Sequence, residues 1–217
     1  MNAKSLRFLI TAGPTREFLD PIRYLSNRSS GKMGYALAEA ARAVSAHVTL
    51  VSGPTALTPP QGLEFVPVTT AEEMASAVWG RFDQVDICIM AAAVGDFRPK
   101  QRAAKKIKKG TFAGMIEVEP TPDILAELGR RKRSQVLIGF AAETEEVERH
   151  ASEKLVQKRL DFIVANDSRA FDAETNRVMF LMSDGKMERL PEMPKLEVAK
   201  AIVERAVRLV RLGGLTR

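Results

Sequence analysis

The chain has 217 residues, 45% of them apolar, and a formal net charge of +6. This length is sufficient for one domain with a single core, and no stretch approaches the roughly 20 apolar residues of a membrane-spanning helix. The single cysteine, Cys88, excludes an intrachain disulfide framework and a cysteine zinc cluster. We therefore expect one cytoplasmic domain over residues 1–217, with Cys88 as an inert thiol in its core.

The first apolar run, 8–10, predicts a strand, and apolar residues at three- and four-residue spacing after position 32 predict a helix. A long polar loop lies between them. The residues at the start of the helix would be Ser29, Ser30 and Gly31. Unpaired N–H groups and the dipole at a helix N-terminus favour an anion. Three cations would strengthen such a phosphate-binding loop: Arg23, Arg28 and Lys32.

Two common phosphate motifs do not fit this loop. A Walker A motif needs a glycine where Ser26 stands and a Ser or Thr where Met33 stands. The dinucleotide fingerprint needs its glycines in one short turn, whereas a long segment separates Gly13 from Gly31. A mobile surface loop that happens to be basic is the alternative interpretation, but loops of this length in a compact unit are usually functional.

Strand and helix patterns alternate along the rest of the chain. Further strands are predicted at 48–51, 65–68, 85–90, 136–139 and 162–165. Further helices are predicted at about 71–82, from 122 onward with Pro122 and Asp123 in the first turn, between 143 and about 159, and at about 196–212. The alternation predicts an α/β fold with a mostly parallel sheet and helices on both faces, whose ligands bind beyond the carboxyl ends of the strands.

A C-terminal antiparallel hairpin at about 176–191 would follow the parallel strands, because two apolar runs flank an Asp184-Gly185 turn. The segment before the third predicted helix is basic. Seven Lys and Arg residues lie between Arg98 and Lys109 with no acid among them, and without them the chain is close to neutral. We expect a flexible basic loop at about 97–113 that meets a local anionic ligand, since nucleic acid would need a broader stripe of charge.

Six motifs resemble, in order and spacing, those of phosphopantothenoylcysteine synthetase. They are TAGPT at 11–15, RYLSNRSSGKMG at 23–34, AAVGDFRP at 92–99, KIKK at 106–109, PDI at 122–124 and GFAAET at 139–144. The resemblance implies a Rossmann-like doubly wound fold and a ligase of coenzyme A biosynthesis. Such an enzyme joins 4′-phosphopantothenate to L-cysteine through an acyl-cytidylate formed from CTP, releasing pyrophosphate and then CMP, with Mg2+ as an expected clamp on the phosphates.

The resemblance also implies roles for individual residues. Asn27 would hold the acyl-cytidylate, Arg23 would grip the substrate phosphate, and Lys106 would close over the nucleotide as part of a lid. The other implied nucleotide contacts are Met90, Ala91, Ala92, Asp96, Pro122, Asp123, Ile124, Leu125, Phe140, Lys154 and Lys158. Taken alone, Lys154 and Lys158 would be an ordinary charged helix face, Asp96 a turn cap and Phe140 a core residue. The metal ligands are not predicted.

The resemblance further implies a homodimer whose active site borrows residues across the interface. In many bacteria this domain is fused behind a flavin-dependent decarboxylase, and the sequence leaves open whether the chain is a stand-alone synthetase. Two positions depart from the family pattern: Gly95 stands where alanine is usual, and Thr121 where asparagine often precedes Pro-Asp. An NAD(P)-dependent oxidoreductase and a basic nucleic-acid-binding module remain the alternatives, and no residue decides between CTP and ATP.

Overall fold

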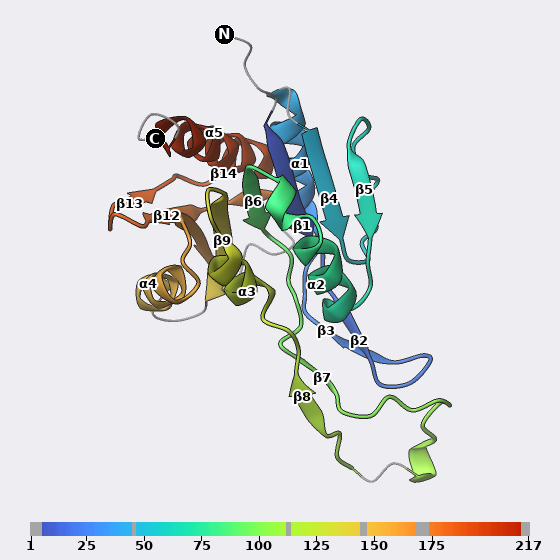
Figure 1. The fold of residues 1–217 in the computed structure, drawn as a ribbon. Coiled ribbons are helices and arrows are strands. Elements are labelled where there is room, and N and C mark those ends of the chain that lie inside the picture. The colour runs from blue at the N-terminus through green and yellow to red at the C-terminus, as the bar shows by residue number, and fades with distance from the viewer. Residues whose placement is uncertain (1–5, 45–46, 112–113, 144–146, 168–173, 214–217) are drawn as a thin grey trace.

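The computed structural model describes residues 6–44, 47–111, 114–143, 147–167 and 174–213 and is built around an eight-stranded sheet (Figure 1). The strand order is β13-β12-β10-β9-β6-β1-β4-β5. These strands are β1 (Arg7–Ala12), β4 (His47–Ser52), β5 (Glu64–Pro67), β6 (Ile87–Met90), β9 (Val136–Glu143), β10 (Phe162–Asp167), β12 (Val178–Met182) and β13 (Met187–Arg189).

All neighbouring strands from β5 to β10 in the strand order are parallel. The two antiparallel pairs of this sheet are β10 with β12 and β12 with β13. This arrangement confirms the predicted α/β fold with a mostly parallel sheet and a C-terminal hairpin. The helices are α1 (Lys32–Ala43), α2 (Ala71–Trp79), α3 (Ile124–Arg131), α4 (Val147–Gln157) and α5 (Lys195–Gly213). Two short 3₁₀ turns lie at Phe82–Gln84 and Lys109–Thr111.

The helices divide between the two faces of the sheet, and β1 shows why. Phe8 and Ile10 point to one side, where the buried residues of α1 and α5 pack, whereas Leu9 points to the other, where α2, α3 and α4 pack. Alternate residues of a strand face opposite sides, so a run of apolar residues without polar interruption is buried on both faces. The sheet is therefore covered by helices on each side, as the alternation predicted.

Some predicted boundaries were wrong. Helix α2 ends at Trp79 rather than near Phe82, because the chain turns at Gly80 and continues into a 3₁₀ turn. Asp123 precedes α3 instead of lying in its first turn, and its carboxylate caps the helix by accepting the N–H of Ala126. Residues 112–113 of the predicted basic loop and Thr144 of the GFAAET motif lie outside the described residues.

Three two-stranded ribbons were not predicted. They are β2 (Arg16–Phe18) with β3 (Tyr24–Ser26), β7 (Phe97–Pro99) with β8 (Val118–Pro120), and β11 (Thr175–Asn176) with β14 (Met193–Pro194). The first two extend away from the sheet on the same side of the molecule (Figure 1). We call the described residues of 97–120 the arm. It contains the segment that was expected to be a basic loop.

Helix α1 lies close over the end of β1 because Gly34 has no side chain. A Cβ atom at Gly34 would lie 2.4 Å from Cβ of Ala12 and 2.9 Å from the carbonyl oxygen of Thr11. Contacts this short force the backbones apart. The glycine therefore sets how near the start of α1 comes to the carboxyl end of β1.

We predict that Gly34→Ala lowers the free energy of unfolding by about 1–3 kcal/mol, because the methyl group overpacks the contact between α1 and β1. This loss exceeds the gain in helix propensity of alanine over glycine, about 1 kcal/mol. Urea denaturation would measure it. The matched control is Gly213→Ala in α5, where nothing lies within 4 Å of the added atom and no loss is expected. Equal effects of the two substitutions would contradict the prediction.

Candidate active site

A cavity of about 810 Å³ lies beyond the carboxyl ends of β1, β6 and β9, in the size range of small-molecule sites. The predicted residues that line it are Asn27, Arg28, Ser29, Ser30, Gly31, Lys32, Met90, Ala91, Ala92, Asp96, Pro122, Asp123, Ile124, Leu125, Phe140, Lys154 and Lys158. Arg23 and Lys106 are not among the lining residues. The fold thus brings four separate motifs to one cavity but leaves two of the expected cations outside it.

The N-terminus of α1 opens into this cavity. Gly31 is the residue before the helix, with φ of 78°, a conformation that favours glycine, and no side chain caps the helix. A Cβ atom at Gly31 would also lie 2.6 Å from Cγ2 of Thr55. The N–H groups of the first turn and the side chain of Lys32 therefore suit an anion. Anion binding by Ser29, Ser30 and Gly31 stays a prediction.

Two buried threonines fix the segment that follows β6. The hydroxyl of Thr11 accepts the N–H of Ala92 at 3.1 Å, and the hydroxyl of Thr15 accepts the N–H of Gly95 at 2.8 Å. Both threonines are fully buried. Asn27 donates from Nδ2 to the carbonyl oxygen of Val94 at 2.9 Å. The two threonines of the TAGPT motif therefore fix the backbone of a segment that lines the cavity, and Asn27 is held beside this segment, which precedes Asp96.

The wall formed by α3 and α4 carries both charge signs. Lys158, which follows α4, forms an ion pair with Asp123, and Lys154 donates from Nζ to the carbonyl oxygen of Phe140 at 2.8 Å. Burial would raise the pKa of Asp123, but the hydrogen bonds from Lys158 and from the N–H of Ala126 lower it below its ordinary value. This wall therefore presents the side chains of Lys154 and Lys158 together with the carboxylate of Asp123.

Arg23 lies at the turn between β2 and β3, where Asp20 binds it. The fully buried carboxylate of Asp20 accepts the N–H groups of Ile22, Arg23 and Ile107, and also Nε of Arg23 at 2.9 Å. The Arg23 guanidinium donates further to the carbonyl oxygen of Ile107. We call this group of contacts the Asp20 clamp. It fastens the residue next to Lys106 onto the β2–β3 ribbon, so the two cations are held near each other outside the cavity.

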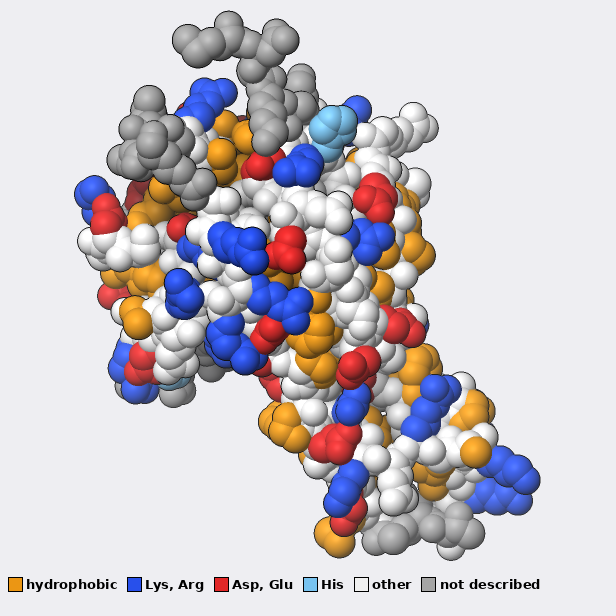
Figure 2. All heavy atoms as spheres, viewed as in Figure 1, with side chains coloured by type: hydrophobic (Ala, Val, Ile, Leu, Met, Phe, Trp, Pro, Cys, Tyr) orange, Lys and Arg blue, Asp and Glu red, His pale blue; other side chains and the backbone are white. Residues whose placement is uncertain are grey.

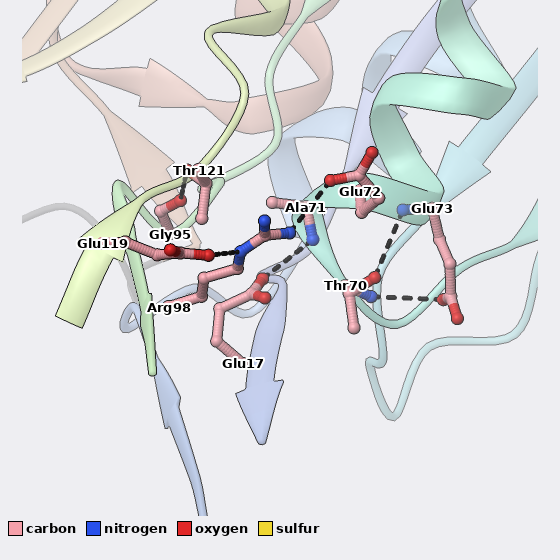
Figure 3. Close-up of polar contacts among 9 residues, drawn as sticks. All are labelled: Glu17, Thr70, Ala71, Glu72, Glu73, Gly95, Arg98, Glu119 and Thr121. Atoms are coloured by element: carbon pink, nitrogen blue, oxygen red, sulfur yellow. Dashed lines mark hydrogen bonds and ion pairs between the residues drawn. The ribbon is translucent and has the colours of Figure 1, made fainter. Parts of the chain in front are cut away.

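Arg98 attaches the base of the arm to the body of the protein (Figure 3). Its guanidinium bridges Glu119 of β8 at 2.8 Å and Glu72 in the first turn of α2 at 3.0 Å. Beside it, the Thr121 hydroxyl donates to the carbonyl oxygen of Gly95. The two positions that depart from the family pattern are thus in direct contact, and the base of the arm is tied both to α2 and to the cavity rim.

Charged side chains gather toward the far end of the arm (Figure 2). At its base, Arg98 and Lys100 are paired with carboxylates. Farther along, Arg102 lies over the ring of Phe18, 4.8 Å from its centre. The arm is therefore docked on the β2–β3 ribbon through backbone contacts, an aromatic contact and the Asp20 clamp, rather than detached from the protein.

Cys88 does not line the cavity. Cys88 is fully buried, and burial raises the pKa of its thiol, which confirms the expected core residue.

Within the described ranges, no group of three or more His, Cys, Asp or Glu residues could hold a metal ion. Across the same ranges, no helix is both long and apolar enough to cross a membrane.

Two polar cavity residues were missed by the sequence analysis. Asn176 of β11 and Lys195 at the start of α5 line the cavity, with exposed fractions of only 4% and 7%. Neither belongs to a motif, and the sequence around them gives no sign that polar side chains are buried there. Their burial depends on the contact of the β11–β14 ribbon with α5, which joins segments distant in the chain.

Comparison with known proteins places the chain among well-matched relatives. The family model described as the DNA/pantothenate metabolism flavoprotein C-terminal domain matches residues 3–209. The coenzyme A biosynthesis bifunctional protein CoaBC of Bacillus subtilis (strain 168) is 48% identical over 211 residues, which cover 95% of this chain and 52% of that protein. The chain therefore spans about half the length of the curated relatives it matches.

Solved structures agree with the fold. The crystal structure of the C-terminal domain of CoaBC is 45% identical, with a TM-score of 0.84, and the match covers 97% of this chain and 99% of that one. A Cab2 mutant in complex with phosphopantothenate-cysteine is 19% identical, with a TM-score of 0.78 and coverage of 96% and 89%. The second likeness concerns the fold alone.

We predict that the Asp20 clamp makes stability depend on pH. Burial opposes ionisation of Asp20, but the three backbone N–H groups and Arg23 outweigh it and hold its pKa well below the ordinary value. A lowered folded-state pKa stabilises the fold above the unfolded-state pKa of about 3.9, and this contribution is lost as the pH falls below that value. Asp20→Asn should therefore lower stability at neutral pH, with a deficit that shrinks below about pH 4.

Urea denaturation at several pH values would test this, with Asp184→Asn as the matched control. Asp184 also has a lowered pKa, through hydrogen bonds from Lys186, but it lies in an exposed hairpin turn. The control should change stability little at any pH, because exposed ion pairs contribute little. A deficit of Asp20→Asn that stays constant from neutral to acid pH would refute the role of its charge.

Proposed function

We propose that this chain, which belongs to the family of the DNA/pantothenate metabolism flavoprotein C-terminal domain, is a CTP-dependent phosphopantothenoylcysteine synthetase. In this proposal it joins 4′-phosphopantothenate to L-cysteine in coenzyme A biosynthesis, in the cytoplasm, as a single domain. The observation that carries the proposal is the cavity, where the start of α1, the segment after β6 and the α3–α4 wall meet. Cationic and N–H donors on these elements suit a triphosphate.

The proposed reaction has two steps. A carboxylate oxygen of phosphopantothenate attacks the α-phosphorus of CTP, the bond to the β-phosphate breaks, and pyrophosphate leaves with the bonding electrons. The amine nitrogen of cysteine then attacks the acyl carbon, the carbon–oxygen bond to the nucleotide breaks, and CMP leaves while the nitrogen gives a proton to solvent. The first step concentrates negative charge, so the N–H groups of α1 and the ammonium groups of Lys154 and Lys158 would stabilise it.

The cavity residues are compatible with Mg2+ bound together with the nucleotide. This ion is usually held by substrate phosphates and one or two carboxylates, so a site made only of protein ligands is not needed. Two carboxylates of the described residues line the cavity, and Asp123 is already paired with Lys158. We therefore propose that Asp96, which the resemblance implies as a nucleotide contact, would help to hold the metal beside the nucleotide. The ion would neutralise charge on the phosphates.

Arg23 and Lys106 would act from outside the cavity of their own chain. We propose that a second copy of the chain brings its arm to the site, so the active enzyme is a homodimer. The ribbons that project from the sheet support this, since they expose large apolar side chains. Ile22 is 60% exposed, Phe97 57% and Met115 83%. Contact with a second copy would remove such surface from water. In this arrangement Asn27 holds the acyl-cytidylate from its own chain.

A decarboxylase is the proposed partner in the next reaction. The chain matches about half of each of two relatives that are named as bifunctional proteins, and this supports a second activity beside its own. We propose that a flavin-dependent decarboxylase, fused or separate, removes the carboxylate of the phosphopantothenoylcysteine that this domain makes.

The first test is release of pyrophosphate by the purified chain with Mg2+ and 4′-phosphopantothenate, comparing CTP with ATP, each with and without cysteine. We expect release that requires phosphopantothenate and is fastest with CTP. Release with neither nucleotide would overturn the proposal. In that event, binding of NAD(P)H would favour an oxidoreductase, and salt-sensitive binding to DNA would favour a nucleic-acid-binding module.

Lys106→Gln and Asn27→Asp should lower kcat/KM by about 100-fold or more, as loss of one charge-stabilising donor does in other enzymes. Both residues are exposed, so the fold should persist, although Asn27→Asp loses a hydrogen bond to Val94 worth about 1 kcal/mol. Lys105→Gln, in the same loop, is the matched control and should keep near-normal turnover. Turnover of the Lys106 or Asn27 variant equal to that of the control would refute the assigned roles.

A further inference from the structure

The cavity has a second wall, which comes from the other face of the sheet. The α3–α4 wall belongs to the face covered by α2, α3 and α4, whereas α5 and α1 pack on the opposite face. Asn176 and Lys195 reach the cavity from that opposite face, through the β11–β14 ribbon and the first residue of α5. A ligand in the cavity would therefore contact Asn176 and Lys195 with a different part of its surface from the part that contacts the α3–α4 wall.

Asn176 presents a buried acceptor that no described residue uses. Its side chain is 96% buried, and within the described part of the chain its Oδ1 has no hydrogen-bond partner. Buried polar atoms are nearly always paired, because an unpaired one loses its hydration without compensation. Since Asn176 lines the cavity, a ligand that donates an N–H or O–H there would satisfy the oxygen.

Positive charge accompanies this acceptor. Lys195 is 93% buried, and its backbone N–H donates to the carbonyl oxygen of Glu174 at 3.0 Å. The carboxylate of Glu174 is paired with Lys32, which also lines the cavity, and the hydrogen bond from Lys32 lowers the pKa of Glu174. The wall thus combines one amide oxygen with the side chains of Lys195 and Lys32, and the carboxylate of Glu174 offsets the charge of Lys32 at the N-terminus of α1.

This combination matches an α-amino acid. Such a molecule carries an N–H donor and a carboxylate on the same carbon atom, so it can satisfy an acceptor and a cation on one small wall. Among the three substrates of the proposed reaction, only cysteine has this arrangement. CTP has no carboxylate, and in phosphopantothenate the amide N–H and the carboxylate are separated by two carbons.

We infer that Asn176 and Lys195 form the subsite for L-cysteine, with Oδ1 of Asn176 accepting the amine and Lys195 binding the carboxylate. The inference rests on the proposed function. In it, the amine is held against the wall opposite the nucleotide, which points the nitrogen toward the acyl group held at Asn27. Asn176 and Lys195 act by binding and orienting the nucleophile.

The first experiment compares Asn176→Leu with wild type. Leucine has a similar size but no acceptor, so KM for cysteine should rise roughly tenfold, the loss of about one hydrogen bond. KM for CTP and for phosphopantothenate, and pyrophosphate release without cysteine, should stay within about twofold. The melting temperature should not fall, because an unpaired buried oxygen has been removed. Thr175→Val, on the same ribbon but outside the cavity lining, is the control and should change none of these.

A second experiment uses Lys195→Met with cysteine and with cysteamine, which has the same amine and thiol but no carboxylate. Wild type should have a higher kcat/KM for cysteine than for cysteamine. In the variant, kcat/KM for cysteine should fall while that for cysteamine stays the same, so most of the preference is lost. Either of two results would overturn the subsite: a rise in KM for phosphopantothenate instead of cysteine, or an unchanged preference for cysteine over cysteamine. Failure of the proposed function would be visible separately, because wild type would then release no pyrophosphate.

Discussion

The close approach of α1 to the end of β1 is the constraint on which the site depends. Gly34 lets the helix rest directly on Ala12, and Gly31 supplies the left-handed residue from which the helix starts. The N–H groups of the first turn then face the same cavity as the segment after β6. Thr11 and Thr15 fix that segment from the strand beneath. A wider separation of α1 from β1 would move the anion-binding end of the helix away from every other group in the cavity.

The cavity is also the place where the two faces of the sheet meet. Residues of α3 and α4 approach from one face, and the β11–β14 ribbon and α5 approach from the other. A parallel sheet leaves its carboxyl edge open to both sides, which is why ligands of such folds collect there. In the proposed reaction this geometry gives the nucleotide and the amine separate walls, with the acyl group between them.

The sheet and its helices could be predicted from the sequence because buried strands require apolar runs, and helices packed on a sheet require apolar residues at three- and four-residue spacing. The ribbons β2–β3 and β7–β8 escaped prediction for a physical reason. Their strands are three residues long and only two of their residues are buried, so they carry no continuous apolar run. They are held by contacts such as the bridge from Arg98 to Glu72 and Glu119, which leave no periodic signal. The residues lining the cavity could be predicted where motifs carried them. Asn176 could not, since its burial is a product of tertiary packing.

The placement of Arg23 and Lys106 was likewise beyond the reach of motif spacing. Two separate motifs assign Arg23 and Lys106 to the same active site, but only the structure shows that Asp20 holds Arg23 and the residue next to Lys106 together on a projecting ribbon. The difference arises because a motif describes which groups act together, whereas their position relative to a cavity depends on how the arm docks.

The Asp20 clamp has a consequence for how the β2–β3 turn and the basic segment of the arm vary in evolution. One carboxylate fastens both Arg23 and the backbone next to Lys106, although these segments are more than 80 positions apart in the chain. Substitutions on either side therefore act on a single hydrogen-bonded unit, and their effects should combine non-additively. A relative that changed the turn at Asp20 would need a compensating change in the basic segment, so the two stretches should vary together in evolution rather than independently.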